Sequence, residues 1–138
     1  MHIILTVIIQ TERDEIYGCF INATINCYAE KKGNDMKGIV DPQSFVFAFK
    51  KGRGHQYPIK KEKEESITFH LFREDSVELF GVGEKEWYDL WVGKKGGKMM
   101  INQSERGNYE YFNGVNQKTG KRRMKVLDVK RIIVIQFK

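Results

Sequence analysis

Cysteine and proline are scarce in this sequence, each occurring only twice in 138 residues. The two cysteines, Cys19 and Cys27, cannot form a disulfide-rich scaffold, and their spacing matches no zinc-binding pattern. We therefore expect a reduced compartment, no metal and no other cofactor. Because 41% of the residues are hydrophobic, the composition is typical of a folded domain and not of a disordered chain.

Signals for export and membrane insertion are also missing. The apolar run at residues 3–9 has no Lys or Arg before it and no small-residue cleavage site after it, unlike a signal peptide. No run approaches the roughly 18 consecutive apolar residues of a membrane-spanning helix. We therefore predict a cytoplasmic protein without a transmembrane segment.

Histidine is rare, with only His2, His55 and His70 available as general bases. Catalysis by a nucleophile requires a Ser, Cys or Thr beside such a base, and no motif of that kind is present. His70 is expected on the solvated face of a strand. The sequence therefore predicts no catalytic histidine, and we expect a protein that is not an enzyme.

One catalytic alternative rests on carboxylates. Glu84, Glu86 and Asp89 lie close together in the sequence, and a pair of carboxylates held at the right separation can hydrolyse a glycosidic bond. Acidic residues near a turn are more often solvated. A carboxylate-dependent hydrolase is therefore the less favoured hypothesis.

The basic residues are concentrated in one segment. The net charge is +6, and residues 118–131 hold seven basic side chains against Asp128 alone. Such a segment can bind nucleic acid or an anionic membrane, although most charge runs only solvate a surface. The candidate contacts for this alternative function are Lys118, Lys121, Arg122, Arg123 and Lys125.

Short apolar runs predict strands along most of the chain. Residues 3–9 and 132–137 are β-branched runs typical of strands that are buried on both faces, and residues 3–21 are expected to form a hairpin. Phe45, Phe47 and Phe49 recur at every second position, so they share one face of a strand, and we expect that face to be core.

The remaining segments complete the expected fold. We predict a loop at residues 50–58, a strand at 67–71, a hairpin connection at 94–97 and a long polar loop at 102–123. Residues 60–66 could form a helical turn or two, but they have no apolar face, so packing would not support a helix there. Residues 1–138 are expected to form a single domain. Its predicted class is mainly β, an antiparallel two-sheet β-sandwich with minor edge helices.

Four motifs, in order along the chain, resemble the TLDc domain of oxidation-resistance proteins. EIYGCF at residues 15–20 is similar to the end of the family's opening hairpin, and SFVFAF at 44–49 to a following strand. LFGVGEKEWYDLWVG at 79–93 is similar to the family's glycine and tryptophan signature. VLDVKRIIVIQF at 126–137 is similar to its closing strand, with Ile133 and Ile135 where Glu and Trp are common.

The resemblance implies a noncatalytic module that acts by docking onto a protein partner. It implies a role in oxidative-stress resistance and binding to the vacuolar proton-pumping ATPase, with no established catalytic residues. The family's usual upstream segment is absent, so we expect a fragment or a short member. Core or turn roles are implied for Gly18, Phe20, Phe45, Phe47, Phe80, Gly81, Gly83, Leu90, Trp91 and Phe137.

Overall fold

The computed structural model describes residues 2–24, 36–66, 68–72, 77–83, 88–94, 97–103, 107–110 and 123–137. Most of these residues are in strands, and the described ranges contain one short 3-10 helix, η1 (Lys61–Lys63). The mainly β prediction is therefore confirmed. The strands are β1 (His2–Thr11), β2 (Ile16–Thr24), β3 (Met36–Ile39), β4 (Phe45–Lys50), β5 (Arg53–Pro58), β6 (Phe69–Phe72), β7 (Glu78–Val82), β8 (Leu90–Gly93), β9 (Lys98–Gln103) and β10 (Arg123–Phe137).

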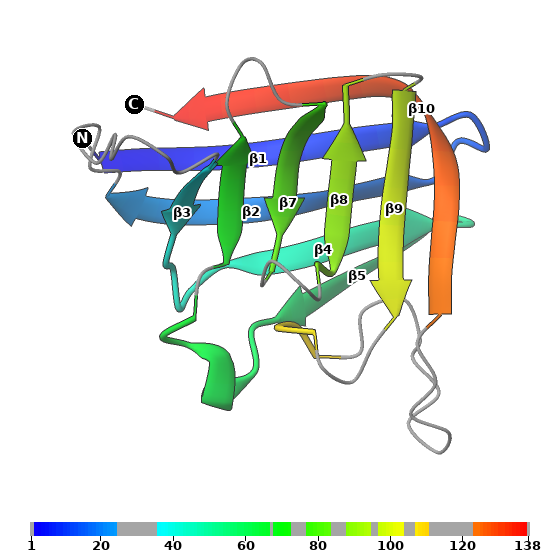
Figure 1. Ribbon diagram of the computed structural model, residues 1–138. Coiled ribbons are helices and arrows are strands. Elements are labelled where there is room, and N and C mark those ends of the chain that lie inside the picture. The colour runs from blue at the N-terminus through cyan, green and yellow to red at the C-terminus, as the bar shows by residue number, and fades with distance from the viewer. Residues whose placement is uncertain are drawn as a thin grey trace.

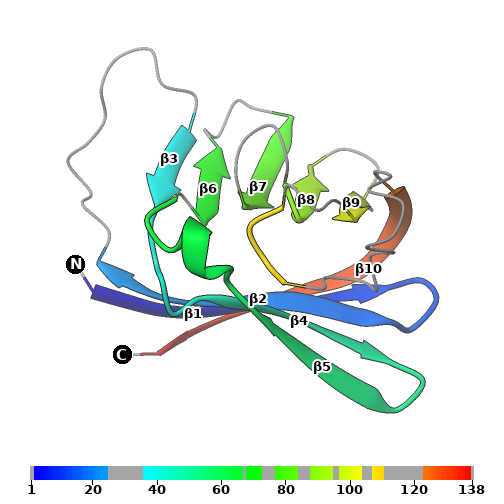
Figure 2. The same cartoon turned by 90° about the horizontal axis from the view of Figure 1, so that it is seen from below.

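The ten strands form one antiparallel sheet in the order β3-β6-β7-β8-β9-β10-β1-β2-β4-β5. The sheet bends over on itself, so that two layers of strands cross each other (Figures 1 and 2). We call them the β1 layer (β1, β2, β4, β5 and residues 129–137) and the β7 layer (β3, β6, β7, β8, β9 and residues 123–128). The antiparallel prediction is confirmed, but the layers belong to a single continuous sheet.

The strand that joins the two layers is β10. Residues 123–128 pair with β9, whereas residues 129–137 pair with β1. Gln10 lies opposite Arg131 and Thr11 lies opposite Val129, so Lys130 is an extra residue in β10 at this point. Such a β-bulge bends a strand and increases its twist. The bulge therefore lies where β10 passes from one layer to the other.

The hydrophobic core lies between the layers and draws on both of them. From the β1 layer it takes the side chains that point inward at every second position of a strand, such as Val7, Ile9 and Val46. From the β7 layer it takes Phe80 and Leu90, which confirms the core role that the sequence predicts for these two residues. Each such side chain contributes roughly 1.5–3 kcal/mol of hydrophobic stabilisation.

Two predictions about strand faces are wrong. Phe45, Phe47 and Phe49 do share one face of β4, but Val46 and Ala48 point into the core, and the phenylalanines point away from it. Residues 132–137 form a strand that is not buried on both faces, because most of its side chains are exposed. An apolar run alone cannot distinguish a central strand from one at the border of a layer.

Other corrections concern single elements. Residues 53–58 form strand β5, paired with β4, where a loop is predicted from the glycines and proline. His70 is buried at 2% exposure and packs edge-on against the ring of Tyr88, although its strand is expected to have a solvated face. Trp91 and Phe137 are expected in the core, but Trp91 is partly exposed and Phe137 is 50% exposed.

Candidate functional site

The candidate site is the side of the β1 layer that faces away from the core. We call it the outer face and define it by the outward-pointing residues of β1, β2, β4 and residues 129–137. In each strand these residues alternate with buried ones. The apolar members, none of which is buried, are Ile4, Ile8, Ile16, Phe20, Phe45, Phe47, Phe49, Ile133, Ile135 and Phe137.

Strand register brings these side chains into continuous rows. Residues directly opposite each other in antiparallel strands lie on the same face of the sheet. Ile135 lies opposite Thr6, and Thr6 lies opposite Phe20. Phe20 in turn lies opposite Phe45, and the two rings stack with centroids 5.1 Å apart. One row of side chains therefore crosses from β10 to β4. A second row begins with Ile133 of β10, which lies opposite Ile8 of β1.

Glycine makes room for the aromatic rings of the outer face. Gly18 lies opposite Phe47, and a Cβ at Gly18 would overlap the Phe47 ring and the carbonyl oxygen of Val7. Phe49 lies in the same way over Gly54 of β5, where a Cβ would be 2.6 Å from the ring. The two rings therefore lie across their neighbouring strands, and the outer face is aromatic along β4.

The outer face carries almost no charge. Among the outward-pointing residues with a register partner that the structure describes, only Arg131 is charged, and none is Asp or Glu. Lys130, the extra residue at the bulge, is exposed beside it. Phe49 is 50% exposed and Ile133 is 40% exposed. Contiguous exposed apolar surface of this kind marks sites of protein interaction in soluble proteins. Chemically, the outer face can bind a partner by burying apolar area.

A second notable cluster surrounds Asp89, which precedes β8. Its Oδ2 accepts a hydrogen bond from the backbone N–H of Asn108 at 3.0 Å, and its Oδ1 accepts one from Tyr109 at 3.4 Å. The Tyr109 hydroxyl lies 2.8 Å from that of Ser44, in the loop before β4. Asp89 is 1% exposed, and burial raises the pKa of its carboxyl to about 7. These two hydrogen bonds hold the backbone of residues 107–110 beside Asp89.

The hydrolase hypothesis depends on more carboxylates than Asp89. Glu84 and Glu86 lie outside the described residues. Asp89 has a raised pKa, as a catalytic acid would require, but both of its oxygens are occupied by backbone N–H groups. Gly83, with φ of 101°, allows the chain to turn beside this carboxylate. The arrangement explains the turn role that the sequence predicts for Gly83.

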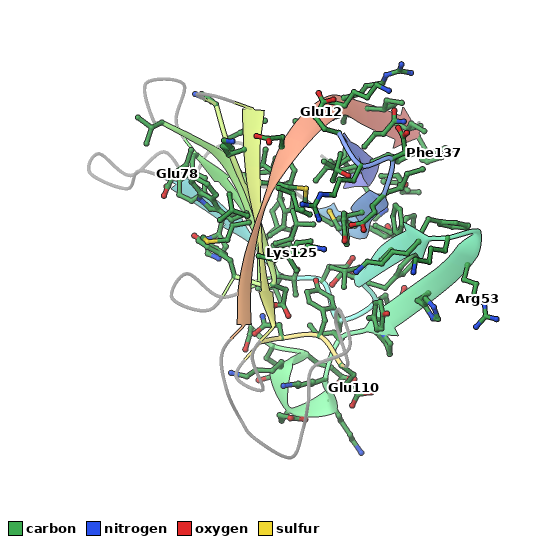
Figure 3. The ribbon with its side chains drawn as sticks, turned by 90° about the vertical axis from the view of Figure 1, so that its right-hand side faces the viewer. Glu12, Arg53, Glu78, Glu110, Lys125 and Phe137 are labelled. Carbon is green, nitrogen blue, oxygen red and sulfur yellow. The ribbon has the colours of Figure 1, made fainter. Side chains whose placement is uncertain are left out.

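A third cluster lies where the β1–β2 hairpin meets β10. The Tyr17 hydroxyl donates a hydrogen bond to Glu15 at 2.6 Å, which holds the pKa of Glu15 below its usual value. Lys125 Nζ is 3.7 Å from the same carboxylate, and Lys50 Nζ lies over the Tyr17 ring, 5.2 Å from its centroid. Figure 3 places Lys125 between the layers. Lys125 is therefore engaged within the fold.

The predicted basic segment falls mainly outside the residues that the structure describes. Lys118, Lys121 and Arg122 are not among them, and Arg123 is the first residue of β10. Of the five candidate contacts, only Lys125 has a described side chain, and it pairs with Glu15. Of these candidates, the structure therefore places only the Lys125 side chain, and that side chain forms an ion pair within the fold.

Cysteine and metal chemistry find little support in the described part of the chain. Cys19 is buried at 1% exposure, and burial raises the pKa of its thiol to about 12, so it stays protonated. Cys27 lies outside the described residues. Within those residues, no group of His, Cys, Asp and Glu side chains is arranged to hold a metal ion.

The predicted family residues divide between two places. Gly18, Phe20, Phe45, Phe47 and Phe137 belong to the outer face. Phe80, Gly81, Gly83, Leu90 and Trp91 belong to or border the β7 layer. The isoleucines of the outer face were not predicted as site residues from the sequence. The signal for them was that residues 3–9 and 132–137 are apolar on both faces of their strands.

No protein-family model and no curated protein matches the chain. Nor does any helix within the described ranges have the length and apolar character needed to cross a membrane. The geometry of the outer face is therefore the main basis on which a function can be argued.

Proposed function

We propose that this chain is a noncatalytic protein-interaction module of the TLDc type, and that the outer face is its docking surface. The observation that carries the proposal is the contiguous apolar face of the β1 layer, in which ten apolar side chains from four strands remain partly exposed. Burying such a surface against a partner provides the main favourable term in protein association.

The conspicuous titratable groups support a noncatalytic role because the fold itself uses them. Asp89 holds the backbone of residues 107–110, and Glu15 accepts a hydrogen bond from Tyr17. Cys19 is a buried neutral thiol. Protection against oxidative stress, which the family resemblance implies, would then be indirect and would act through the partner.

The chemistry of the outer face favours a protein partner over nucleic acid. Proteins that bind single strands combine exposed aromatic rings with Lys and Arg along the phosphate path. Here Phe20 and Phe45 stack on each other and isoleucines fill the neighbouring strands. The only charges described in residues 129–137 are Lys130 and Arg131, at one end of the face. An apolar partner surface matches this composition better.

The family resemblance names the first partner to test, the vacuolar proton-pumping ATPase. Purified chain is incubated with membrane vesicles that carry the pump, and binding is measured by co-sedimentation while proton pumping is followed with a pH-sensitive dye. We expect saturable binding and a change in pumping rate. Phe49→Asp places a charge in the outer face and is expected to weaken binding about tenfold or more.

The matched control is Val126→Asp. Val126 is 59% exposed and lies in the part of β10 that pairs with β9, so it places the same charge on the other layer. It should leave binding unchanged. If the wild-type chain does not bind the vesicles, the proposed partner is wrong. If both variants lose binding equally, the outer face is not the docking surface.

A further inference from the structure

One edge of the sheet is open over an unusual length. Residues 123–128 of β10 pair with β9, but residues 129–137 pair only with β1. Their other edge has no strand partner among the residues that the structure describes. Figure 1 shows this half of β10 along the border of the β1 layer, beyond β1. Backbone N–H and C=O groups along such an edge form a template for another strand.

The other edges of the sheet are protected in the usual ways. At one end of the sheet, β5 contains Gly54 and Pro58 and begins with Arg53. At the other end, β3 is only four residues long. Glycine, proline, charge and short length all discourage pairing between molecules. Beyond the bulge at Lys130, residues 132–137 of β10 lack these protections, since the last charged residue within the described range is Arg131.

Apolar side chains are exposed on both faces of this half-strand. Ile133 and Ile135 point to the outer face, with 40% and 38% of their surface exposed. Val134 lies opposite Val7 and so shares the inward side, yet it is 58% exposed because it lies at the border of the layer. A second strand beside β10 would cover apolar surface on both sides of the sheet.

We propose that residues 129–137 pair with the same residues of a second copy of this chain, in antiparallel orientation about a twofold axis. The strand is complementary to itself in either central register. With Ile133 on the axis, Ile132 lies opposite Val134 and Val129 opposite Phe137. With Val134 on the axis, Ile133 lies opposite Ile135. Apolar residues thus meet near the axis, as favourable cross-strand pairs require, whereas Arg131 lies opposite Ile135 in the first register and Phe137 in the second.

The charge of Arg131 does not oppose this arrangement. Arg131 lies two or three residues from the axis, so the two copies of its side chain are separated by at least four residues along the strand, or roughly 13 Å. That distance exceeds the Debye length of about 8 Å at physiological ionic strength. The interface therefore places no like charges from the described range opposite each other.

The geometry of the pairing has a consequence for the outer face. Antiparallel neighbours are related by a twofold axis perpendicular to the sheet, so the two β1 layers would join into one continuous layer with both outer faces on the same side. The inference is independent of the proposed function, because it stands on the open edge and would hold whatever partner the outer face binds.

The test measures molar mass by light scattering over a range of protein concentrations. The wild-type chain is expected to shift from monomer to dimer. Val134→Lys places two like charges beside the axis and should raise the dissociation constant roughly tenfold or more. The matched control, Val126→Lys, changes a valine of nearly equal exposure in the β9-paired half, 59% against 58%, and should still dimerise. A wild-type chain that stays monomeric at high concentration overturns the proposal.

A second measurement separates edge pairing from packing through the outer face. In a Cys27→Ser background, Ile133→Cys or Val134→Cys should form a disulfide with its own copy, because opposite residues near the axis have Cα atoms about 4.5–5.5 Å apart. Phe137→Cys is too far from the axis to do so. Cross-linking of Phe137→Cys alone, or a dimer that Phe49→Lys dissociates and Val134→Lys does not, overturns the proposal.

Discussion

At the scale of single residues, Asp89 connects three parts of the chain. Its backbone N–H donates to Val82, and its carboxylate accepts from Asn108 and Tyr109. Burial raises the pKa of this carboxyl from 3.8 to about 7, since removal from water disfavours the charged form more than the two backbone N–H groups favour it. The folded chain therefore binds a proton here at a pH where the unfolded chain has released it.

The sign of the pH dependence follows from this difference. The stabilisation from the Asp89 proton is full below about pH 4 and is lost as the pH rises through about 7, by on the order of 4 kcal/mol. Asp89→Asn cannot ionise. We therefore expect the wild type to lose free energy of unfolding as the pH rises from about 4 to 8, and Asp89→Asn to lose less of it, as measured by denaturant titration. A constant difference between the two proteins over this range would show that Asp89 does not titrate as described.

At the scale of strands, the contact between β2 and β4 depends on a glycine. A Cβ at Gly18 would overlap both the Phe47 ring and the backbone of β1, and backbone cannot move away without disturbing the sheet. Gly18→Ala is expected to lower the free energy of unfolding by about 1–3 kcal/mol, the usual cost of overpacking.

The matched change is Gly54→Ala in β5, where only the Phe49 ring is close to the added Cβ. Phe49 is 50% exposed, so its ring can rotate into solvent. Thermal or denaturant unfolding should therefore show a smaller loss for Gly54→Ala than for Gly18→Ala. Equal losses would mean that the backbone contact at Gly18 has no special cost.

Strand positions could be predicted from the sequence better than strand faces. The alternation in residues 45–49 correctly places three phenylalanines on one side, but both sides of β4 are apolar. Only the pairing of β4 with β2, where Tyr17 and Cys19 are buried, identifies the inner side. The strand β5 was missed because its glycine and proline are typical of loops, and an edge strand tolerates both.

The candidate site was hidden by the same ambiguity. Five of its residues have expected family roles in core or turns, whereas the outer face depends on where the layers lie. The bulge at Lys130 is equally invisible in the sequence, because it is fixed by the register of β10 against β1. Register depends on contacts between residues far apart in the chain, which local patterns do not contain.

At the scale of the whole molecule, β10 makes the two layers one cooperative unit. Leu127 of β10 is 6% exposed and packs in the core that both layers share. Leu127→Ala is expected to cost about 2–5 kcal/mol. Because the layers share this core and this strand, hydrogen exchange at Val82 in β7 and at Ile21 in β2 should accelerate by similar factors.

The control for this experiment is Val126→Ala, which shortens an exposed side chain of the same strand and should change stability by no more than about 0.5 kcal/mol. If Leu127→Ala accelerates exchange only at Val82, the layers unfold separately.

The pairing of β1 with β10 also constrains how the protein is made. Ile4 lies opposite Phe137, so β1 leaves the ribosome well before β10, the strand with which it pairs. Until β10 emerges, β1 has only the neighbouring hairpin strand β2 beside it. Long-range pairing of this kind slows folding to milliseconds or seconds. One edge of β1 is thus exposed while the chain between β2 and β10 is translated, and chaperones that recognise extended apolar segments have time to bind it.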